Sequence, residues 1–147
     1  MPLRFLALLL GALLSACRVT PPTYAPITLA DGLVVHDLVV PEGGAPVANG
    51  DTVSVHYDLR LENGSSVESS RETGQALSFL VGAGLVPTGL DRVVLGMRLY
   101  GRRELFVPGA LAFGEQGRPP RIAPGAKVVF EIELIEHRPA PAPPGQT

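Results

Sequence analysis

The arrangement of apolar and polar residues predicts several strands and one helix. Residues 51–64, DTVSVHYDLRLENG, alternate between apolar and polar side chains and end in Asn63-Gly64. Such alternation places one face of a strand on the core, and Asn-Gly favours a hairpin turn. The segment 126–138 alternates over the longest stretch, and four of its side chains are expected to face the core: Val128, Phe130, Ile132 and Leu134.

Shorter apolar segments complete the predicted sheet. Residues 32–40 and 102–108 are typical of strands, and a return strand starts near Val67, breaks at 69–75 and resumes at 76–81. Thr88 followed by Asp91 is typical of a capping box at a helix start. The helix is expected to bury Leu90, Val93, Val94 and Met97 and to end at Gly96 or Gly101. Five or six antiparallel strands and one short helix predict an α+β fold in which the helix covers one face of a twisted sheet.

The N-terminus indicates export and lipid attachment. Arg4 precedes an apolar run, 5–14, that is too short to span a bilayer, so residues 1–16 are predicted to be a signal peptide. The run ends in LLSAC, which resembles a bacterial lipobox and contains the single cysteine, Cys17. We expect cleavage before Cys17 and lipidation of it, which would anchor the protein to the cell envelope. A chance cysteine behind an ordinary signal peptide is the alternative. In Gram-negative lipoproteins, an Asp directly after the lipidated cysteine resembles a signal for retention in the inner membrane. This chain has Arg18 at that position, which favours the outer membrane, facing the periplasm, in a Gram-negative host.

Composition divides the rest of the chain. Pro-rich residues 17–31 are predicted to be a tether, residues 32–138 a single domain, and residues 139–147 a disordered tail. A net charge of −2 without a basic cluster argues against nucleic-acid binding.

The sequence offers little support for cofactor chemistry. The glycine-rich turn at 82–89 lacks the Lys and Ser or Thr of a phosphate loop, and Asp91 would repel a phosphate, so no nucleotide is expected. The three histidines, His36, His56 and His137, lack metal-ligand spacing, so we expect neither a metal nor another cofactor. What remains is a set of inward-facing aromatic residues that either fill a small core or line an apolar pocket: Tyr57, Phe79, Phe113 and Phe130.

Four blocks together resemble one known family. VSVHYDLRLENGSSVESSR, FLVGAGLVPTGLDRVVLGMRLYGRRELFVP, ALAFGEQG and IAPGAKVVFEIELIE follow the order and spacing of the FKBP-type peptidyl-prolyl isomerase domain from about Asp51 to Glu136. The resemblance implies a five- or six-stranded antiparallel half-barrel around one short helix. It also implies interconversion of cis and trans X–Pro bonds in Pro-containing polypeptides, without a nucleophile or cofactor.

The resemblance assigns roles to individual residues. Tyr57 matches the pocket tyrosine, and Glu68 stands where the family usually has Asp. The other matching positions are the pocket walls Phe79 and Phe130, the rim residue Val86 and the residue over the mouth, Ile122.

Five positions depart from the family pattern. Smaller residues replace aromatic ones at Val67, Leu77 and Leu90, and Phe113 lacks the hydroxyl of the usual tyrosine. Pro87 removes a backbone N–H that in the family bonds a ligand carbonyl. Two lost hydrogen bonds of about 1 kcal/mol each would weaken binding or rate roughly tenfold to thirtyfold. A weakened isomerase is therefore expected, with a non-catalytic peptide-binding module or a domain with a vestigial pocket as alternatives. Residues 109–125 form a short loop without an inserted flap, and we expect a monomer.

Overall fold

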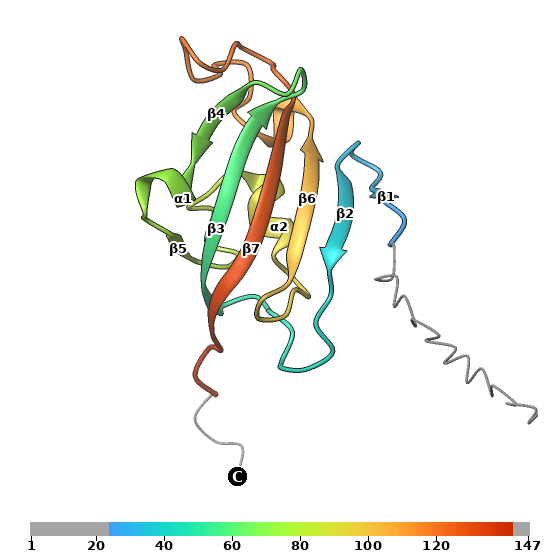
Figure 1. Cartoon of the computed structure of the whole chain (residues 1–147), viewed down its shortest axis with the longest axis vertical. Coiled ribbons are helices and arrows are strands. Elements are labelled where there is room, and N and C mark those ends of the chain that lie inside the picture. The colour runs from blue at the N-terminus through green and yellow to red at the C-terminus, as the bar shows by residue number, and fades with distance from the viewer. Residues whose placement is uncertain (1–23, 143–147) are drawn as a thin grey trace, which may run out of the picture.

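Seven antiparallel strands form one twisted sheet in the computed structural model, which describes residues 24–142. The described strands follow the order β1-β2-β6-β7-β3-β4, and β5 pairs with β3 (Figure 1). The strands are β1 (Ile27–Thr28), β2 (Val34–Val39), β3 (Thr52–Leu61), β4 (Ser66–Ser69), β5 (Leu77–Leu80), β6 (Arg102–Val107) and β7 (Val128–Arg138). The predicted α+β fold is confirmed, and the sheet exceeds the expected five or six strands because the short β1 is added at its edge.

The two longest strands, β3 and β7, form the centre of the sheet. Tyr57 lies opposite Ile132 and Leu59 lies opposite Phe130 in their antiparallel register. Both strands turn one face toward the core, as their alternating sequences predict. The core-facing residues of β7 are all buried, with exposed fractions of 1% for Val128, 3% for Phe130, 0% for Ile132 and 0% for Leu134.

The helix α2 (Thr88–Val93) lies behind the sheet in the view of Figure 1. Leu90, Val93, Val94 and Met97 are buried, as predicted. The predicted capping box is wrong: Pro87 is the N-cap residue, and no side chain caps the helix. Instead, the Asp91 carboxylate accepts the backbone N–H groups of Gly82 and Gly84 at 2.8 and 3.3 Å. The helix ends at Val93, earlier than either expected glycine.

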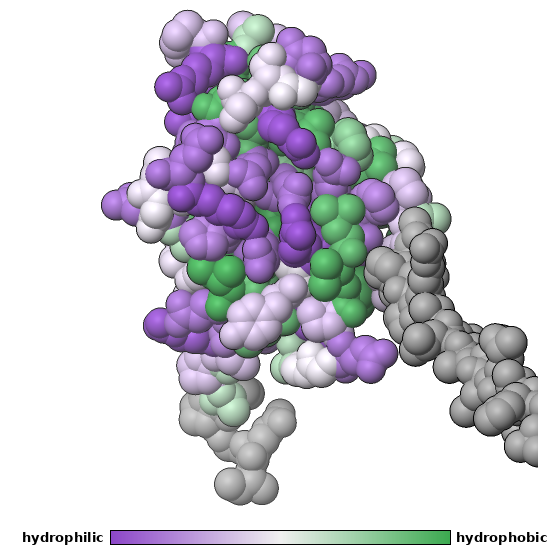
Figure 2. Space-filling view, in the orientation of Figure 1, coloured by the Kyte–Doolittle hydropathy of each residue, from purple (hydrophilic) through white to green (hydrophobic). Residues whose placement is uncertain are grey.

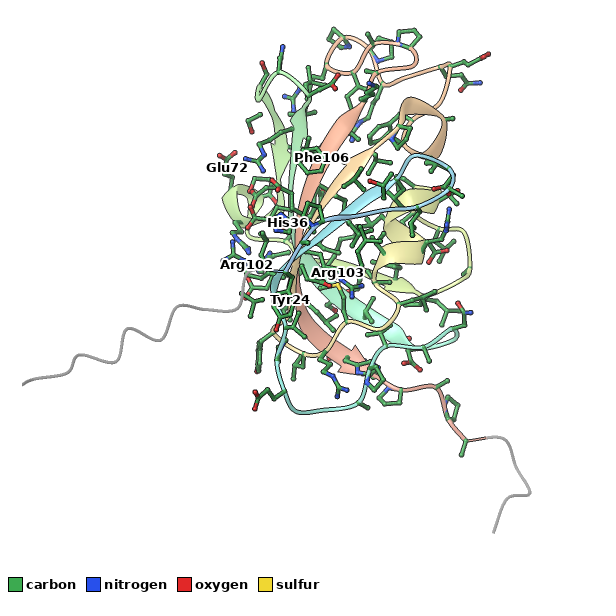
Figure 3. All side chains as sticks on the ribbon, turned by 90° about the vertical axis from the view of Figure 1, so that its right-hand side faces the viewer. Tyr24, His36, Glu72, Arg102, Arg103 and Phe106 are labelled. Carbon is green, nitrogen blue, oxygen red and sulfur yellow. The ribbon has the colours of Figure 1, made fainter. Side chains whose placement is uncertain are left out.

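The other end of α2 is held by an arginine from the sheet. Arg103 of β6 donates from Nη1 to the carbonyl oxygens of Val93 and Leu95, at 2.5 and 2.9 Å. Its Nε also bonds Asp37 of β2. Arg103 therefore lies between β2 and the end of α2 (Figure 3) and satisfies carbonyl groups that the helix leaves open.

Two short helices account for interruptions in the strand pattern. α1 (Ser70–Thr73) separates β4 from β5 where the return strand was expected to break. The hydroxyl of Ser70 accepts the N–H of Tyr57 at 2.8 Å, so the side chain replaces a backbone partner beside β3. The second, η1 (Gly109–Leu111), is a 3₁₀ turn after β6.

The ordered unit is longer than the predicted domain at both ends. β1 lies inside the predicted tether, because Ile27 and Thr28 pair with residues of β2. Ala140, in the predicted tail, donates its N–H to Asp51 Oδ1 at 2.8 Å. The predicted signal peptide, Cys17 and the last five residues of the predicted tail lie outside the described residues. Within residues 24–142, no helix has the length and apolar character that crossing a membrane requires.

The face of the sheet turned away from α2 is rich in charged side chains. Figure 2 shows hydrophilic residues across the centre of this face, with apolar residues around them. Ion pairs connect different elements there: Arg60 of β3 lies 3.1 Å from Glu104 of β6, across the intervening β7, and Arg71 of α1 lies 2.5 Å from Glu133 of β7. The candidate site is on the opposite, apolar side.

Candidate active site

Aromatic side chains from three strands and one loop pack on the side of the sheet that α2 covers. Phe79 of β5 and Phe130 of β7 are 4% and 3% exposed. The rings of Tyr57 and Phe130 are 6.3 Å apart between centroids and tilted by 55°. Tyr57 and Phe113 are partly buried and pack on the same cluster. The inward orientation of these four aromatics is therefore confirmed.

The apolar residues predicted to complete the site join the same cluster. Val67, Leu90 and Ile122 are 9%, 1% and 0% exposed, so Ile122, expected over the mouth, is in fact fully enclosed. Leu77 and Val86 are partly buried against this cluster. Pro87 follows Val86 directly in the chain and is the N-cap residue of α2. The structure thus brings the predicted apolar positions to one region, and their roles toward a substrate remain predictions.

A polar chain runs along the edge of this cluster. The Tyr57 hydroxyl donates to Oε1 of Glu68, across the β3–β4 hairpin. The other carboxylate oxygen of Glu68 lies 2.9 Å from Nη2 of Arg118. The Arg118 guanidinium also lies 6.0 Å from the centre of the Phe113 ring, within the range of a cation–π contact. Glu68 therefore connects the strand that carries Tyr57 to the loop that carries Phe113.

This arrangement determines the protonation of both partners. Burial, followed by the hydrogen bond to the Glu68 carboxylate, raises the pKa of Tyr57 to about 12. The Tyr57 hydrogen bond, reinforced by Arg118, lowers the pKa of Glu68 below its usual value. At neutral pH the site therefore holds a protonated phenol and an ionised carboxylate, and the phenol's proton is directed to Glu68.

The loop over the site is closed at its base by glycines. The N–H of Gly125 donates to the carbonyl of Gly114 at 2.9 Å, and the N–H of Gly114 donates to Gly109 at 2.8 Å. A Cβ added to Gly109 would lie only 2.3 Å from the carbonyl oxygen of Gly125. Residues 114–125 are therefore a closed loop whose two ends are fixed next to β6 and β7.

The glycine turn 82–84 has a local structural role. The backbone N–H groups of Gly82 and Gly84 donate to the Asp91 carboxylate, as described above. The described part of the chain, residues 24–142, holds no cluster of three or more side chains suited to a metal ion. The groups that the structure does bring together at the site are the apolar cluster and the Tyr57–Glu68 pair.

Sequence reasoning did not identify the two arginines at this site. Arg118 pairs with Glu68, and Nη1 of Arg121 donates to the carbonyl of Val67 at 2.9 Å. Each partner is about 50 residues away in the chain. No local pattern predicts a pairing over that separation, since it depends on how the 114–125 loop folds back onto β4.

Comparison with known proteins agrees with this geometry. The family described as FKBP-type peptidyl-prolyl cis-trans isomerase matches residues 43–135. "FK506-binding protein" from Streptomyces anulatus is 43% identical over 97 residues, which cover 64% of this chain and 78% of that protein. "FK506-binding protein 4" from Dictyostelium discoideum is 40% identical over 114 residues, 78% of this chain but only 30% of that longer protein. The crystal structure of AtFKBP13 superposes with a TM-score of 0.71 at 32% identity, covering 77% of this chain and 98% of that one.

The chain belongs to the FKBP-type peptidyl-prolyl cis-trans isomerase family, because the family match covers more than half of its length. The fold is the family fold, since the likeness to AtFKBP13 extends over nearly all of that structure.

Proposed function

We propose that this chain catalyses the cis/trans isomerisation of X–Pro peptide bonds in exported proteins. The observation that carries the proposal is the Tyr57–Glu68 hydrogen bond beside the packed rings of Phe79, Phe113 and Phe130. The uncatalysed reaction has a barrier of about 20 kcal/mol, because rotation removes the conjugation of the amide.

An apolar surface favours the rotated amide. The planar amide is the more charge-separated form, so it loses more stabilisation than the twisted form when water is excluded. In this proposal, Phe79, Phe130 and Val86 contact the prolyl ring. The Tyr57 hydroxyl and its Glu68 partner supply the polar edge at which the rotating amide is held.

The test is exchange spectroscopy by NMR on Ala-Leu-Pro-Phe peptides at increasing protein concentration. We expect the exchange rate to rise in proportion to the protein, and Tyr57→Phe to reduce kcat/KM by about fivefold through the loss of one hydrogen bond. Arg138→Gln, an exposed change at the end of β7, serves as the matched control. No acceleration at any concentration would contradict catalysis.

A non-catalytic peptide-binding module is the second candidate. The observations that favour it are the small side chain of Val67, the missing hydroxyl at Phe113, and Pro87 at the N-cap of α2. Binding of the same peptides without faster exchange would support this second function, and activity would exclude it.

We further propose that Cys17 is lipidated and that the domain acts as a monomer in the cell envelope. The sequence LLSAC ending in Cys17 supports the anchor. In a Gram-negative host the expected location is the outer membrane, facing the periplasm. Metabolic labelling with a radioactive or clickable fatty acid is expected to mark the wild-type chain and not Cys17→Ala, which should appear in the soluble envelope fraction. Equal labelling of both chains would contradict the anchor.

A further inference from the structure

Two guanidinium groups from the 114–125 loop lie over consecutive residues of β4. Arg121 bonds the carbonyl of Val67 and Arg118 bonds the carboxylate of Glu68, each at 2.9 Å. Val67 and Glu68 are both positions of the candidate active site. The loop therefore brings positive charge to the edge of the apolar surface that would receive a proline.

The two arginines differ in how their charge is balanced. Glu68 neutralises Arg118 and at the same time accepts the Tyr57 hydroxyl. Within residues 24–142 no carboxylate lies within ion-pair distance of Arg121, whose partner is a neutral carbonyl group. Glu115, the acidic residue of this loop, is exposed and forms an ion pair with neither arginine. Arg121 acts on Glu68 only as a more distant charge, which helps to lower the pKa of that carboxyl, so among the described residues it has no ion-pair partner of its own.

Arg121 also keeps most of its hydrogen-bonding capacity. A guanidinium has five N–H donors in a fixed plane, and the Val67 carbonyl uses one nitrogen. The residue is exposed, so a bound segment can reach it. A guanidinium is planar and permanently charged. Among the groups that a peptide commonly offers, the one that matches it best is a carboxylate, because its two oxygens can accept two parallel N–H groups.

We infer that the site prefers X–Pro segments that carry Asp or Glu next to the proline, and that Arg121 is the residue that determines this specificity. This inference rests on the proposed function, because it names the substrate class of the same site. The attraction between an exposed arginine and a carboxylate corresponds to about a threefold to fivefold preference at low salt. Salt reduces that preference, since exposed charges are screened within about 10 Å at 0.1 M.

The test compares acetyl-Ala-Glu-Pro-Phe-amide with the Gln and Lys peptides, all with uncharged ends. The quantity measured is kcat/KM by NMR exchange, divided by each peptide's own uncatalysed rate, at 20 and 500 mM salt. The expected order is Glu above Gln above Lys, with a Glu-to-Gln ratio of about three to five that approaches one at high salt. Arg121→Gln is expected to abolish the ratio.

Arg98→Gln is the matched control for Arg121→Gln. Arg98 also donates to a backbone carbonyl, that of Gly44, but in the β2–β3 loop region, at the opposite end of the molecule from residues 114–125 (Figure 1). The Arg98→Gln variant is expected to keep the wild-type preference for the Glu peptide over the Gln peptide. Glu68→Gln supplies a change of opposite sign, because it leaves Arg118 unneutralised and should raise the Glu-to-Gln ratio whatever it does to the absolute rate.

The outcomes separate this inference from the proposed function. Equal acceleration of the Glu and Gln peptides, or a preference that Arg121→Gln leaves intact, overturns the inference while the isomerase function stands. If no peptide is accelerated, the isomerase function fails. The inference is then tested by binding: the Kd values of the Glu and Gln peptides are measured by NMR titration, and the Glu peptide should bind more tightly to the wild type but not to Arg121→Gln.

Discussion

Arg102 and Arg103 are neighbours in β6, and their side chains lie on opposite faces of the sheet. Arg103 lies on the α2 side and donates to the carbonyls of Val93 and Leu95. Arg102 lies on the charged face and pairs with Glu131. The Arg103 side chain is 18% exposed and that of Arg102 is 41% exposed. Of these two adjacent residues, Arg103 therefore makes an interior polar contact and Arg102 makes a surface ion pair.

This difference predicts unequal costs for the same substitution. Arg103→Gln removes a charged donor from two helix-end carbonyls and should lower the free energy of unfolding by about 1.5 to 3 kcal/mol. Arg102→Gln, the matched control, loses a surface ion pair that is worth about 0 to 1 kcal/mol. Urea denaturation of both variants checks this. Equal losses would contradict the assignment of Arg103 to the end of α2.

The contact between Gly109 and Gly125 gives a second prediction. Gly109→Ala would place a methyl group against the backbone of Gly125, which cannot rotate away as a side chain can. We expect a loss of about 1 to 3 kcal/mol in unfolding free energy and a displaced 114–125 loop, visible as NMR shift changes at Phe113 and Arg118. Gly43→Ala is the control, because its added Cβ meets nothing within 4 Å. A stable Gly109→Ala chain with unchanged loop shifts would be inconsistent with this contact.

A third prediction concerns acid stability. Asp51 accepts the N–H groups of Ala48 and Ala140 and lies 2.7 Å from Nε2 of His137. These contacts, with the two backbone groups first, lower the pKa of Asp51 from 3.8 to about 2. Because the folded pKa is below the unfolded one, the stabilisation is present above about pH 4 and is lost as the pH falls toward 2.

Asp51→Asn should therefore flatten the decline of the thermal midpoint between pH 4 and pH 2, while lowering that midpoint at neutral pH. Glu42→Gln, an exposed change in the loop before β3, should keep the wild-type decline. Scanning calorimetry at several pH values measures both effects. An Asp51→Asn chain that declines as steeply as the wild type would show that other carboxylates control acid unfolding.

The fourth prediction concerns the departures from the family pattern. If the pocket is weakened at the expected positions, Phe113→Tyr should raise kcat/KM by about fivefold through one added hydrogen bond. Combining it with Val67→Phe should raise activity further, because the larger side chain narrows the space in which the prolyl ring is held. Phe106→Tyr, on the charged face and 42% exposed, is the matched control and should change nothing. Since Val67 is only 9% exposed, the unfolding midpoint of the double variant has to be measured alongside. No gain in activity by a folded double variant would contradict this view of the limiting positions.

The sequence predicted the elements whose contacts repeat along the chain. β3 and β7 follow from strict alternation, and the buried face of α2 follows from helical spacing, because one periodic signal is reinforced over many residues. The edge strand β1 was missed since two residues carry no period, and its pairing depends on β2. The capping box failed for a different reason: Asp91 has the right spacing from Thr88, but its carboxylate is bound by the turn at Gly82 and Gly84.

The candidate site was predictable only in part, for a related reason. Its aromatic members lie on elements whose inward faces the pattern indicates, and the resemblance to the family named their positions. The arginines at 118 and 121 come from an irregular loop, where neither periodicity nor the family pattern fixes where a long side chain ends. Their placement depends on the hydrogen bonds that close the loop at Gly114 and Gly125.

The turn at Gly82 and Gly84 is, in physical terms, an anion-binding loop whose anion is built into the chain. Two backbone N–H groups hold the Asp91 carboxylate, which belongs to the helix that follows. Because this carboxylate is part of the chain, it cannot dissociate as a bound ion can, and its hydrogen bonds connect the turn after β5 to α2. Ala83 between the donors and Leu85 after them do not bind Asp91, and both are exposed, Leu85 to 71%. Substitutions should therefore be tolerated at 83 and 85 but not at 91, because the Asp91 side chain takes the place that a bound ligand would have in a glycine-rich ligand loop.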